Sequence, residues 1–272
     1  MAILDNRHSH PGHPAEFIHV LGLGVGVVNI NQVIEIMARW IEEKKPQYIC
    51  VTPAHSIMDC YREPHLYSLF NASGLTVPDG MSLVWLLKLR GYGRVGRVAG
   101  SDLMDAVMRY SVSQGWKHYF YGGAPGVYQK LSANLQAKYP GVKIVGGYSP
   151  PFRPLTDEED REIVEKINAT APDIVWIGIS SPRQEGWMAG HKGKINGAVL
   201  VGVGAAFDFL SGQKKRAPRW MQRLGFEWLH RLISEPRRLW RRYSQYPLFA
   251  LLAFAEMLGI KVVSEEFHRK SA

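Results

Sequence analysis

Short apolar runs alternate with helical stripes along most of this 272-residue chain. The stripes place apolar side chains at i, i+3, i+4 and i+7 from Val33 to Trp40, and new ones begin at Met81, near Gly126 and after Thr156. The strand candidates are 17–21, 48–52, 76–77, 118–121, 143–145, 174–179 and 198–203. Several of them lack polar alternation, which is typical of strands covered on both faces. The pattern predicts an α/β fold with a largely parallel, Rossmann-like sheet and helices on both faces.

The C-terminal part of the chain predicts a basic amphipathic helical appendage. After Pro236, one helical stripe is apolar or aromatic and the other faces are basic: Leu239, Tyr243 and Tyr246 against Arg237, Arg238, Arg241 and Arg242. The apolar run 248–260 that follows is interrupted by Glu256 and is too short to cross a bilayer, which needs about 20 residues. This arrangement favours an element that lies on a membrane surface. A basic helix packed on the body of the protein is the alternative.

The net charge of +9 implies an anionic partner. Ten basic residues against two glutamates give segment 214–242 a net charge of +8, so nearly all of the excess lies there. No nucleic-acid-binding motif accompanies this charge, and the aromatic side chains beside it suit a membrane interface. We therefore expect an anionic membrane surface and no nucleic acid as the partner. Two cysteines and an N-terminal segment without an apolar signal region favour a reducing compartment and no secretion.

The loops that follow the strands are where a sheet of this kind binds its ligands. Gly122 and Gly123 open a Gly-rich turn (122–126) that either holds a phosphate on free backbone N–H groups or simply makes a tight turn. The glycines at 22, 24 and 26 are spaced GxGxG rather than GxGxxG, and no acidic residue ends the next strand. We expect no nicotinamide cofactor. The absence of a Gly-Lys-Ser/Thr motif argues against an NTPase.

Two loop carboxylates are candidates for acid–base chemistry. Asp79 stands between Pro78 and Gly80, after a short strand and before a helix, where a carboxylate serves as a general base or caps the helix. Its position alone favours capping. Asp208 is open to the same two interpretations. No Asp-x-Asp motif follows a strand, and the histidines at 8, 10 and 13 lie in a flexible-looking tail, so no metal site is predicted.

Eleven short motifs occur in a characteristic order: VTP (51–53), PDG (78–80), RVAGSD (97–102), GGAPG (122–126), YPG (139–141), PRQE (182–185), GVG (202–204), FDF (207–209), RAP (216–218), EWL (227–229) and EPRR (235–238). This set resembles the WecG/TagA/CpsF family of bacterial glycosyltransferases over residues 20–249. The family includes N-acetylmannosaminyltransferases of wall teichoic acid synthesis, the N-acetylmannosaminuronic acid transferase of enterobacterial common antigen, and exopolysaccharide glucosyltransferases. Ala54 departs from the family, in which Asn is frequent at that position.

The resemblance implies an inverting, metal-independent transfer from a UDP-sugar to a polyprenyl-diphosphate-linked sugar. By position, Asp79 matches the family's catalytic base, and this outweighs the capping interpretation. The residues that match the nucleotide-sugar pocket are Thr52, Arg97 and Gln184, and those that match diphosphate-contacting arginines near the membrane are Arg231, Arg238 and Arg241. We expect the turn at Gly122 and Gly123 to help stabilise the diphosphate charge, and Asp208 to complete the substrate site.

These inferences divide the chain into a flexible tail (1–16), an α/β catalytic domain (17–215) and an Arg-rich appendage (216–272) that docks on the membrane and closes the active site. The hypothesis is a cytoplasmic UDP-sugar-dependent glycosyltransferase of cell-surface polysaccharide biosynthesis, attached peripherally to the inner face of the bacterial membrane. A non-enzymatic basic protein that docks on a membrane or on nucleic acid is the alternative. The donor sugar (glucose, N-acetylmannosamine or its uronate), the pathway and the existence of a homo-oligomer stay open.

Overall fold

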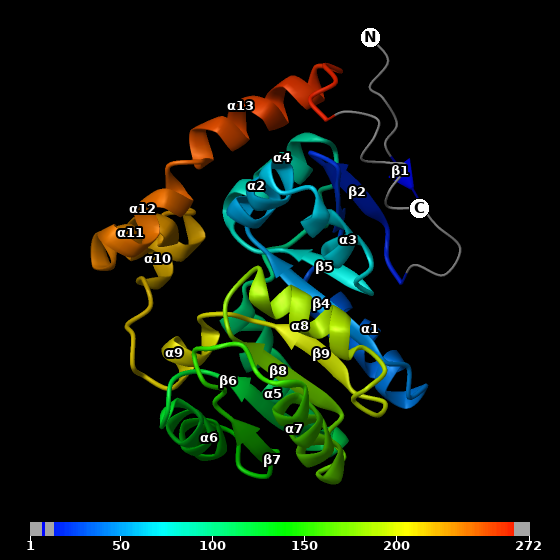
Figure 1. The fold of residues 1–272 in the computed structure, drawn as a ribbon. Coiled ribbons are helices and arrows are strands. Elements are labelled where there is room, and N and C mark those ends of the chain that lie inside the picture. Colours follow the sequence, from blue (N-terminus) through cyan, green and yellow to red (C-terminus); the bar gives the residue numbers. More distant parts are fainter. Residues whose placement is uncertain (1–6, 9–13, 264–272) are drawn as a thin grey trace. The chain divides into compact units, whose positions relative to one another are not determined.

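The computed structural model describes residues 7–8 and 14–263 (Figure 1). Most of the predicted N-terminal tail, including two of its three histidines, lies outside the described residues. A small antiparallel sheet contains β1 (Arg7–His8), β2 (Phe17–Val20) and β3 (Leu23–Gly26), in that order. Strand β3 covers part of the GxGxG run and was not predicted. Its backbone comes so close to its neighbours that a Cβ at Gly26 would lie 2.9 Å from Leu75.

The larger sheet of the described residues has six strands in the order β5-β4-β9-β8-β6-β7. They are β4 (Gln47–Thr52), β5 (Leu75–Pro78), β6 (Lys117–Gly122), β7 (Lys143–Tyr148), β8 (Ile174–Gly178) and β9 (Val199–Gly202). The pairs β4–β9, β9–β8, β8–β6 and β6–β7 are parallel. All residues of β5 and β9 are buried. The predicted α/β fold is confirmed, and each of the seven predicted strand runs corresponds to a strand.

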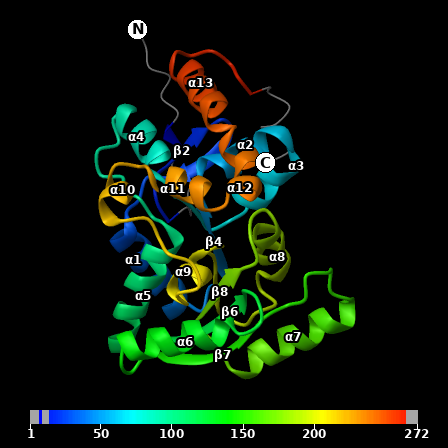
Figure 2. The ribbon, with the colours of Figure 1, turned by 90° about the vertical axis from the view of Figure 1, so that its left-hand side faces the viewer.

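Helices follow the strands and cover the sheet. The first nine are α1 (Ile30–Glu42), α2 (Ala54–Arg62), α3 (His65–Asn71), α4 (Met81–Leu89), α5 (Gly100–Gln114), α6 (Val127–Lys138), α7 (Asp157–Ala169), α8 (Arg183–His191) and α9 (Ala206–Leu210). Figure 2 shows α1 and α5 on one face of the parallel strands and α7 and α8 on the other. The predicted stripe of α1 is buried, from Val33 to Trp40. A capping box between Thr156 and Glu159 fixes the start of α7.

Four C-terminal helices complete the described chain: α10 (Arg219–Arg223), α11 (Glu227–Ser234), α12 (Pro236–Tyr243) and α13 (Tyr246–Met257). The predicted stripe after Pro236 is divided between two helices, because α12 ends at Tyr243 and α13 begins at Tyr246. Leu239 and Tyr243 are buried, as the stripe predicts. Helix α13 packs on α2.

The chain forms two compact units. The first unit takes up the described parts of Met1–Asn29, Val51–Val98 and Arg216–Ala272, and the second takes up Ile30–Cys50 and Ala99–Lys215. The C-terminal helices therefore belong to the same unit as α2, α3 and α4. Strand β4 ends in the first unit, because Thr52 lies beyond the boundary at Cys50.

Candidate active site

Backbone hydrogen bonds bring three predicted site residues together in the first unit. The N–H of Asp79 donates to the carbonyl of Thr52 over 3.0 Å, which joins the end of β5 to the end of β4. The N–H of Val98 donates to the carbonyl of Pro78 over 2.9 Å, which holds the segment with Arg97 against the same strand end. Thr52, Asp79 and Arg97 thus converge where ligands of such sheets bind.

The turn at Gly80 leaves the Asp79 carboxylate outside helix α4. Gly80 is the N-cap of α4, with φ of 93°, a conformation that favours glycine. Asp79 precedes this cap, and its carboxylate forms no hydrogen bond with any residue that the structure describes. The capping interpretation of Asp79 is therefore wrong. The Asp79 side chain is partly buried, and it does not cap helix α4.

The surroundings of Asp79 make its carboxylate unusually basic. Burial raises the pKa of the Asp79 carboxyl to about 6, and the negative charge of Glu227 adds to the rise. Three nearby arginines, Arg97, Arg231 and Arg216, oppose it. At neutral pH this carboxylate is mostly ionised yet accepts a proton more readily than an ordinary aspartate does, which is what a general base requires.

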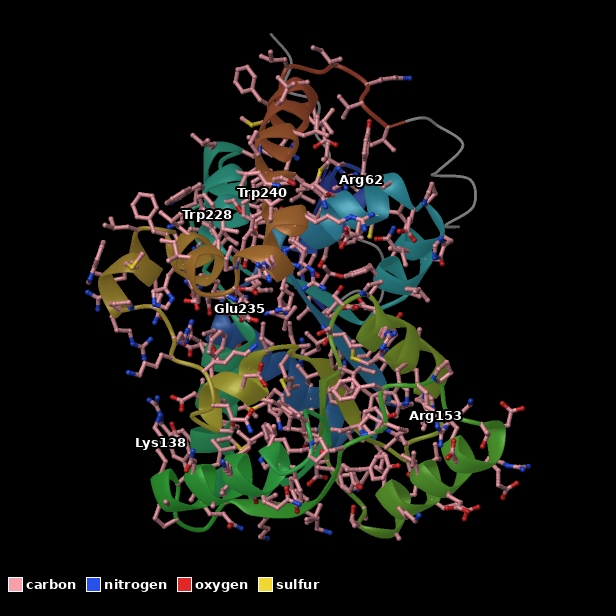
Figure 3. All side chains as sticks on the ribbon, turned by 60° about the vertical axis from the view of Figure 1, so that its left-hand side comes forward. Arg62, Lys138, Arg153, Trp228, Glu235 and Trp240 are labelled. Carbon is pink, nitrogen blue, oxygen red and sulfur yellow. The ribbon has the colours of Figure 1, made fainter. Side chains whose placement is uncertain are left out.

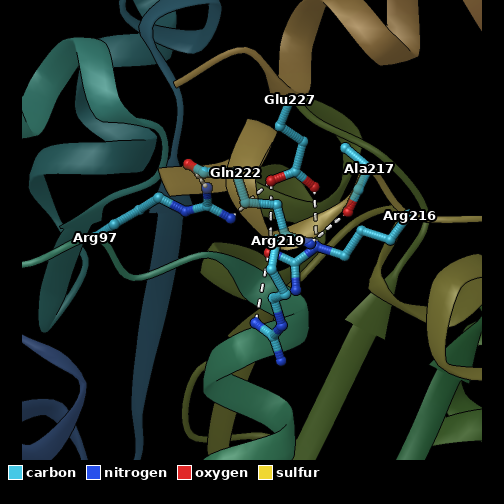
Figure 4. Close-up of polar contacts among 6 residues, drawn as sticks. All are labelled: Arg97, Arg216, Ala217, Arg219, Gln222 and Glu227. Atoms are coloured by element: carbon cyan, nitrogen blue, oxygen red, sulfur yellow. Dashed lines mark hydrogen bonds and ion pairs between the residues drawn. The ribbon is translucent and has the colours of Figure 1, made fainter. Parts of the chain in front are cut away.

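Glu227 joins two of these arginines in an ion-pair network (Figure 4). Arg97 Nη2 lies 2.7 Å from Glu227 Oε2, and Arg216 Nε lies 2.9 Å from Oε1. Arg97 also donates to the carbonyl of Gln222 over 3.2 Å, and the Gln222 amide donates to the carbonyl of Ala217 over 2.6 Å. Burial alone would raise the pKa of Glu227, but the hydrogen bonds and charges of both arginines outweigh it and lower that pKa. The network stays charged at neutral pH.

The C-terminal arginines differ in the groups on which their charges act. The charge of Arg231 on α11 acts on Asp79, and the charge of Arg238 on α12 acts on Tyr243. The third predicted arginine, Arg241, is exposed on α12. Its neighbour Arg242, which the sequence did not single out, acts on both Tyr243 and Tyr246.

Aromatic rings pack between these arginines. The Tyr243 and Tyr246 rings lie 5.2 Å apart between centroids, and Trp228 on α11 (Figure 3) contacts both edge-on at 6.0 and 5.9 Å. Tyr243 also contacts His55 at 6.3 Å. Burial, then the charges of Arg242 and Arg231, lower the pKa of His55 to about 3, so this ring is neutral at physiological pH.

The Gly-rich turn lies in the second unit. Gly122 has φ of 129°, and a Cβ there would lie 2.6 Å from the carbonyl carbon and oxygen of Gly178. The N–H of Gly123 donates to the carbonyl of Gly178 over 3.1 Å. These glycines are thus explained by close backbone approach in the sheet. The Gly123 N–H is not available to a phosphate, so the expectation that this group is free is wrong.

The two remaining predicted residues, Gln184 and Asp208, also lie in the second unit. The buried Gln184 amide accepts from the N–H of Gly204 over 3.1 Å and donates to Glu185 over 2.9 Å. It therefore fixes the loop after β9. Asp208 pairs with Lys214 at 3.1 Å and braces the loop after α9. Their roles toward a substrate stay predictions.

Sequence reasoning did not single out four residues as part of the site: Glu227 and Arg216, whose charges act on Asp79, and Arg242 and His55, which act on or contact Tyr243. Glu227 had a visible signal, since it is one of only two acidic residues in the basic segment 214–242. His55 lies in the first turn of α2, three residues after β4 ends, near the strand end where sheets of this kind bind ligands. Nothing in the sequence distinguishes Arg242 from Arg241, because the choice depends on how α12 is rotated against the unit.

The described residues contain no group of three or more His, Cys, Asp or Glu residues placed to hold a metal ion. None of their helices is both long and apolar enough to span a membrane.

Comparison with known proteins identifies the family of the chain. The family model described as the glycosyl transferase WecG/TagA/CpsF family matches residues 18–262. The chain belongs to this family. It is therefore a glycosyltransferase, and the resemblance inferred from the ordered motifs is confirmed. Family membership sets aside the alternative of a non-enzymatic docking protein.

Two relatives in the family carry the same name, N-acetylglucosaminyldiphosphoundecaprenol N-acetyl-beta-D-mannosaminyltransferase. The relative from Bacillus spizizenii is 29% identical over 80% of this chain and 82% of its own length. The relative from Bacillus subtilis is 29% identical over 84% of this chain and 87% of its own length. Both alignments cover most of each protein, so the similarity extends over both units.

Proposed function

We propose that this enzyme transfers a sugar from a UDP-sugar to a polyprenyl-diphosphate-linked saccharide by an inverting, metal-independent reaction with Asp79 as the base. The observation that carries the proposal is the Asp79 carboxylate, which is partly buried, has no hydrogen-bond partner among the described residues and has a pKa raised to about 6. Arginines surround it, as a reaction with a diphosphate leaving group requires.

The reaction is a single displacement. Asp79 takes the proton of an acceptor hydroxyl, and the hydroxyl oxygen forms a bond to the anomeric carbon of the donor sugar. The bond from that carbon to the UDP oxygen breaks on the opposite face, and its electron pair leaves with UDP. Attack and departure on opposite faces invert the anomeric centre. Arg97 and Arg231, whose charges act on Asp79, are placed to stabilise the negative charge that grows on the diphosphate.

The names of the relatives suggest the substrates to test first. Both relatives are named for an N-acetylmannosaminyl donor group and for N-acetylglucosaminyldiphosphoundecaprenol as the acceptor. We infer that this chain uses an acceptor of the same class, an N-acetylhexosamine on a polyprenyl diphosphate, in cell-envelope polymer synthesis. N-acetylmannosamine is our first candidate for the donor sugar, ahead of glucose and N-acetylmannosaminuronic acid.

A donor panel tests this proposal. The purified enzyme is incubated with synthetic N-acetylglucosaminyl-diphosphate-lipid and each UDP-sugar in the presence of EDTA, and products are analysed by mass spectrometry and NMR. We expect one disaccharide whose new linkage has the anomeric configuration opposite to that of the donor. Transfer from no UDP-sugar, together with no thermal stabilisation by UDP, would overturn the proposal. Retention of configuration would exclude the single displacement.

Helices α12 and α13 support docking on an anionic membrane surface at the inner face of the cell membrane. Trp240 on α12 is 65% exposed (Figure 3). Large apolar side chains also lie exposed on α13 and just after it: Leu248, Leu251 and Phe254 on the helix and Leu258 at its C-terminal end. The arginines of α12 lie directly before them in the chain. Apolar side chains flanked by basic ones are typical of helices that lie in a bilayer interface.

Vesicle sedimentation tests the docking surface. Phe254→Asn is expected to reduce binding to phosphatidylglycerol vesicles several-fold, because it removes an exposed apolar side chain from α13. Phe152→Asn is the matched control, since Phe152 is 84% exposed in the loop before α7. Equal losses in both variants, or none in Phe254→Asn, would contradict docking through α13.

A further inference from the structure

Glu227 is the first residue of α11, and its carboxylate lies among arginines that act on Asp79. We propose that Glu227 is a positioning residue for sugar transfer: it fixes the guanidinium groups of Arg97 and Arg216, two of the arginines whose charges act on Asp79, and it places one negative charge among them. This inference rests on the proposed function, in which Asp79 is the base.

The geometry of the network restricts both arginines. Glu227 Oε2 accepts from Arg97 at 2.7 Å, Oε1 accepts from Arg216 Nε at 2.9 Å, and Arg216 Nη2 lies 3.4 Å from Oε2. The side chains are only 12%, 17% and 18% exposed for Arg97, Arg216 and Glu227. Ion pairs shielded from water in this way hold their geometry better than surface pairs do. The two carboxylate oxygens of Glu227 thus fix the orientation of the Arg97 and Arg216 guanidinium groups.

The position of the network connects distant parts of the first unit. Arg97 follows β5 and α4 in the chain, Arg216 precedes α10, and Glu227 begins α11. The carbonyl of Gln222 on α10 accepts a second bond from Arg97 at 3.2 Å. The guanidinium of Arg97 is therefore held from two C-terminal helices at once. A change at Glu227 should reach the Asp79 loop through this guanidinium.

A carboxylate at this place requires a physical reason, because it repels the diphosphate that the site binds. Its charge also acts on Asp79 against the arginines. The charged groups that act on Asp79 are Arg97, Arg216 and Arg231 on the positive side and Glu227 on the negative side. The phenols of Tyr243 and Tyr246 lie near enough to be affected by Asp79 in turn.

Without Glu227, the arginines would make Asp79 a weaker base. Opposite charges favour the ionised form of a carboxyl and lower its pKa, and a like charge raises it. The base strength of a catalytic carboxylate decreases with its pKa, so the arginines that stabilise the leaving group would slow proton removal. Glu227 offsets this effect while it holds two of the arginines. A purely structural ion pair would stabilise the fold but would have no effect on the pH at which Asp79 titrates.

The pH dependence of kcat/KM for the acceptor separates the two roles. In the wild type we expect kcat/KM to fall below pH about 6, where Asp79 becomes protonated. In Glu227→Gln, the fall in kcat/KM is expected at a pH lower by half a unit or more. At pH values above this fall, the rate should be several-fold lower than in the wild type. The KM for the donor should rise. Glu227→Asp, which keeps the charge, should leave the position of the fall unchanged.

Glu63→Gln is the control, because it removes an exposed carboxylate of the same unit outside the site and should change none of these quantities. A folded Glu227→Gln with the wild-type pH profile and donor KM would overturn the inference. Arg216→Gln provides a second test should Glu227→Gln not fold. In this variant the fall in kcat/KM should occur at a higher pH than in the wild type, because a positive charge that acts on Asp79 is lost. A shift to lower pH in Arg216→Gln would contradict the inference. A wild type without transfer would instead refute the proposed function.

Discussion

The Asp79→Asn variant should be more stable than the wild type at pH 8, because the wild type ionises a carboxyl that its fold desolvates. Burial raises the pKa of Asp79 from 3.8 to about 6. Well below pH 3.8, this group is protonated in both folded and unfolded protein and has no effect. As the pH rises through 3.8 to above 6, the unfolded chain ionises first, and the folded state loses stability relative to it.

The size of the effect follows from the two pKa values. At ~1.36 kcal/mol per pH unit, a rise from 3.8 to about 6 corresponds to at most roughly 3 kcal/mol. Because Asp79 is only partly buried, we expect roughly 1–3 kcal/mol, which in a protein of this size raises Tm by about 2–4 °C per kcal/mol. Calorimetric Tm measurements at pH 8, 6 and 4 check it, and the gain should shrink to a small fraction of its pH 8 value by pH 4.

The matched control is Glu165→Gln, the same carboxyl-to-amide change at an exposed position of α7. It should change stability by less than about 0.5 kcal/mol at every pH. An Asp79→Asn variant no more stable than the wild type at pH 8 would refute the reasoning. A gain that persists unchanged at pH 4 would refute it as well, because a desolvated charge produces no effect once the carboxyl is protonated.

Two further substitutions test the packing of each unit. Gly122→Ala should cost about 2–4 kcal/mol in thermal or urea unfolding, because its Cβ would lie 2.6 Å from the Gly178 carbonyl. Gly126→Ala should cost less, about 1–2 kcal/mol, because its Cβ would meet nothing within 4 Å and only the φ of 82° is strained. Glu256→Gln should lower the free energy of unfolding by about 2–4 kcal/mol, because it leaves Arg90 without its buried ion-pair partner at 2.5 Å. An unchanged Tm would contradict the importance of this pair for holding α13.

The strands and the N-terminal ends of the helices could be predicted because their signals are local. Apolar runs that alternate with helical stripes predicted the parallel sheet. A helix was expected after Thr156, and the structure shows α7 beginning there with a capping box. Strand β3 was not predicted, because its glycines were considered only as a possible dinucleotide-binding motif. They are there because neighbouring backbone and side chains come close, as Leu75 does to Gly26, and such close approach depends on tertiary packing.

Asp79 could be found as a candidate residue, but its environment could not. Its pKa depends first on burial and then on charges such as that of Glu227, which lies far along the sequence and reaches the site only through the fold of the first unit. Sequence position alone favoured capping for Asp79, and the structure shows a side chain that caps nothing. The same limit applies to Arg241 and Arg242, since both are arginines of one helix and only its rotation decides which acts on Tyr243.

The central claim, that Asp79 removes the acceptor proton during sugar transfer, is tested most directly by the turnover of Asp79→Asn. The measurement uses a saturating UDP-sugar and N-acetylglucosaminyl-diphosphate-lipid, with UDP-induced thermal stabilisation recorded on the same preparation. We predict a loss in kcat of about 10²–10⁴-fold with UDP stabilisation retained. Turnover of Asp79→Asn at the wild-type rate would contradict the claim.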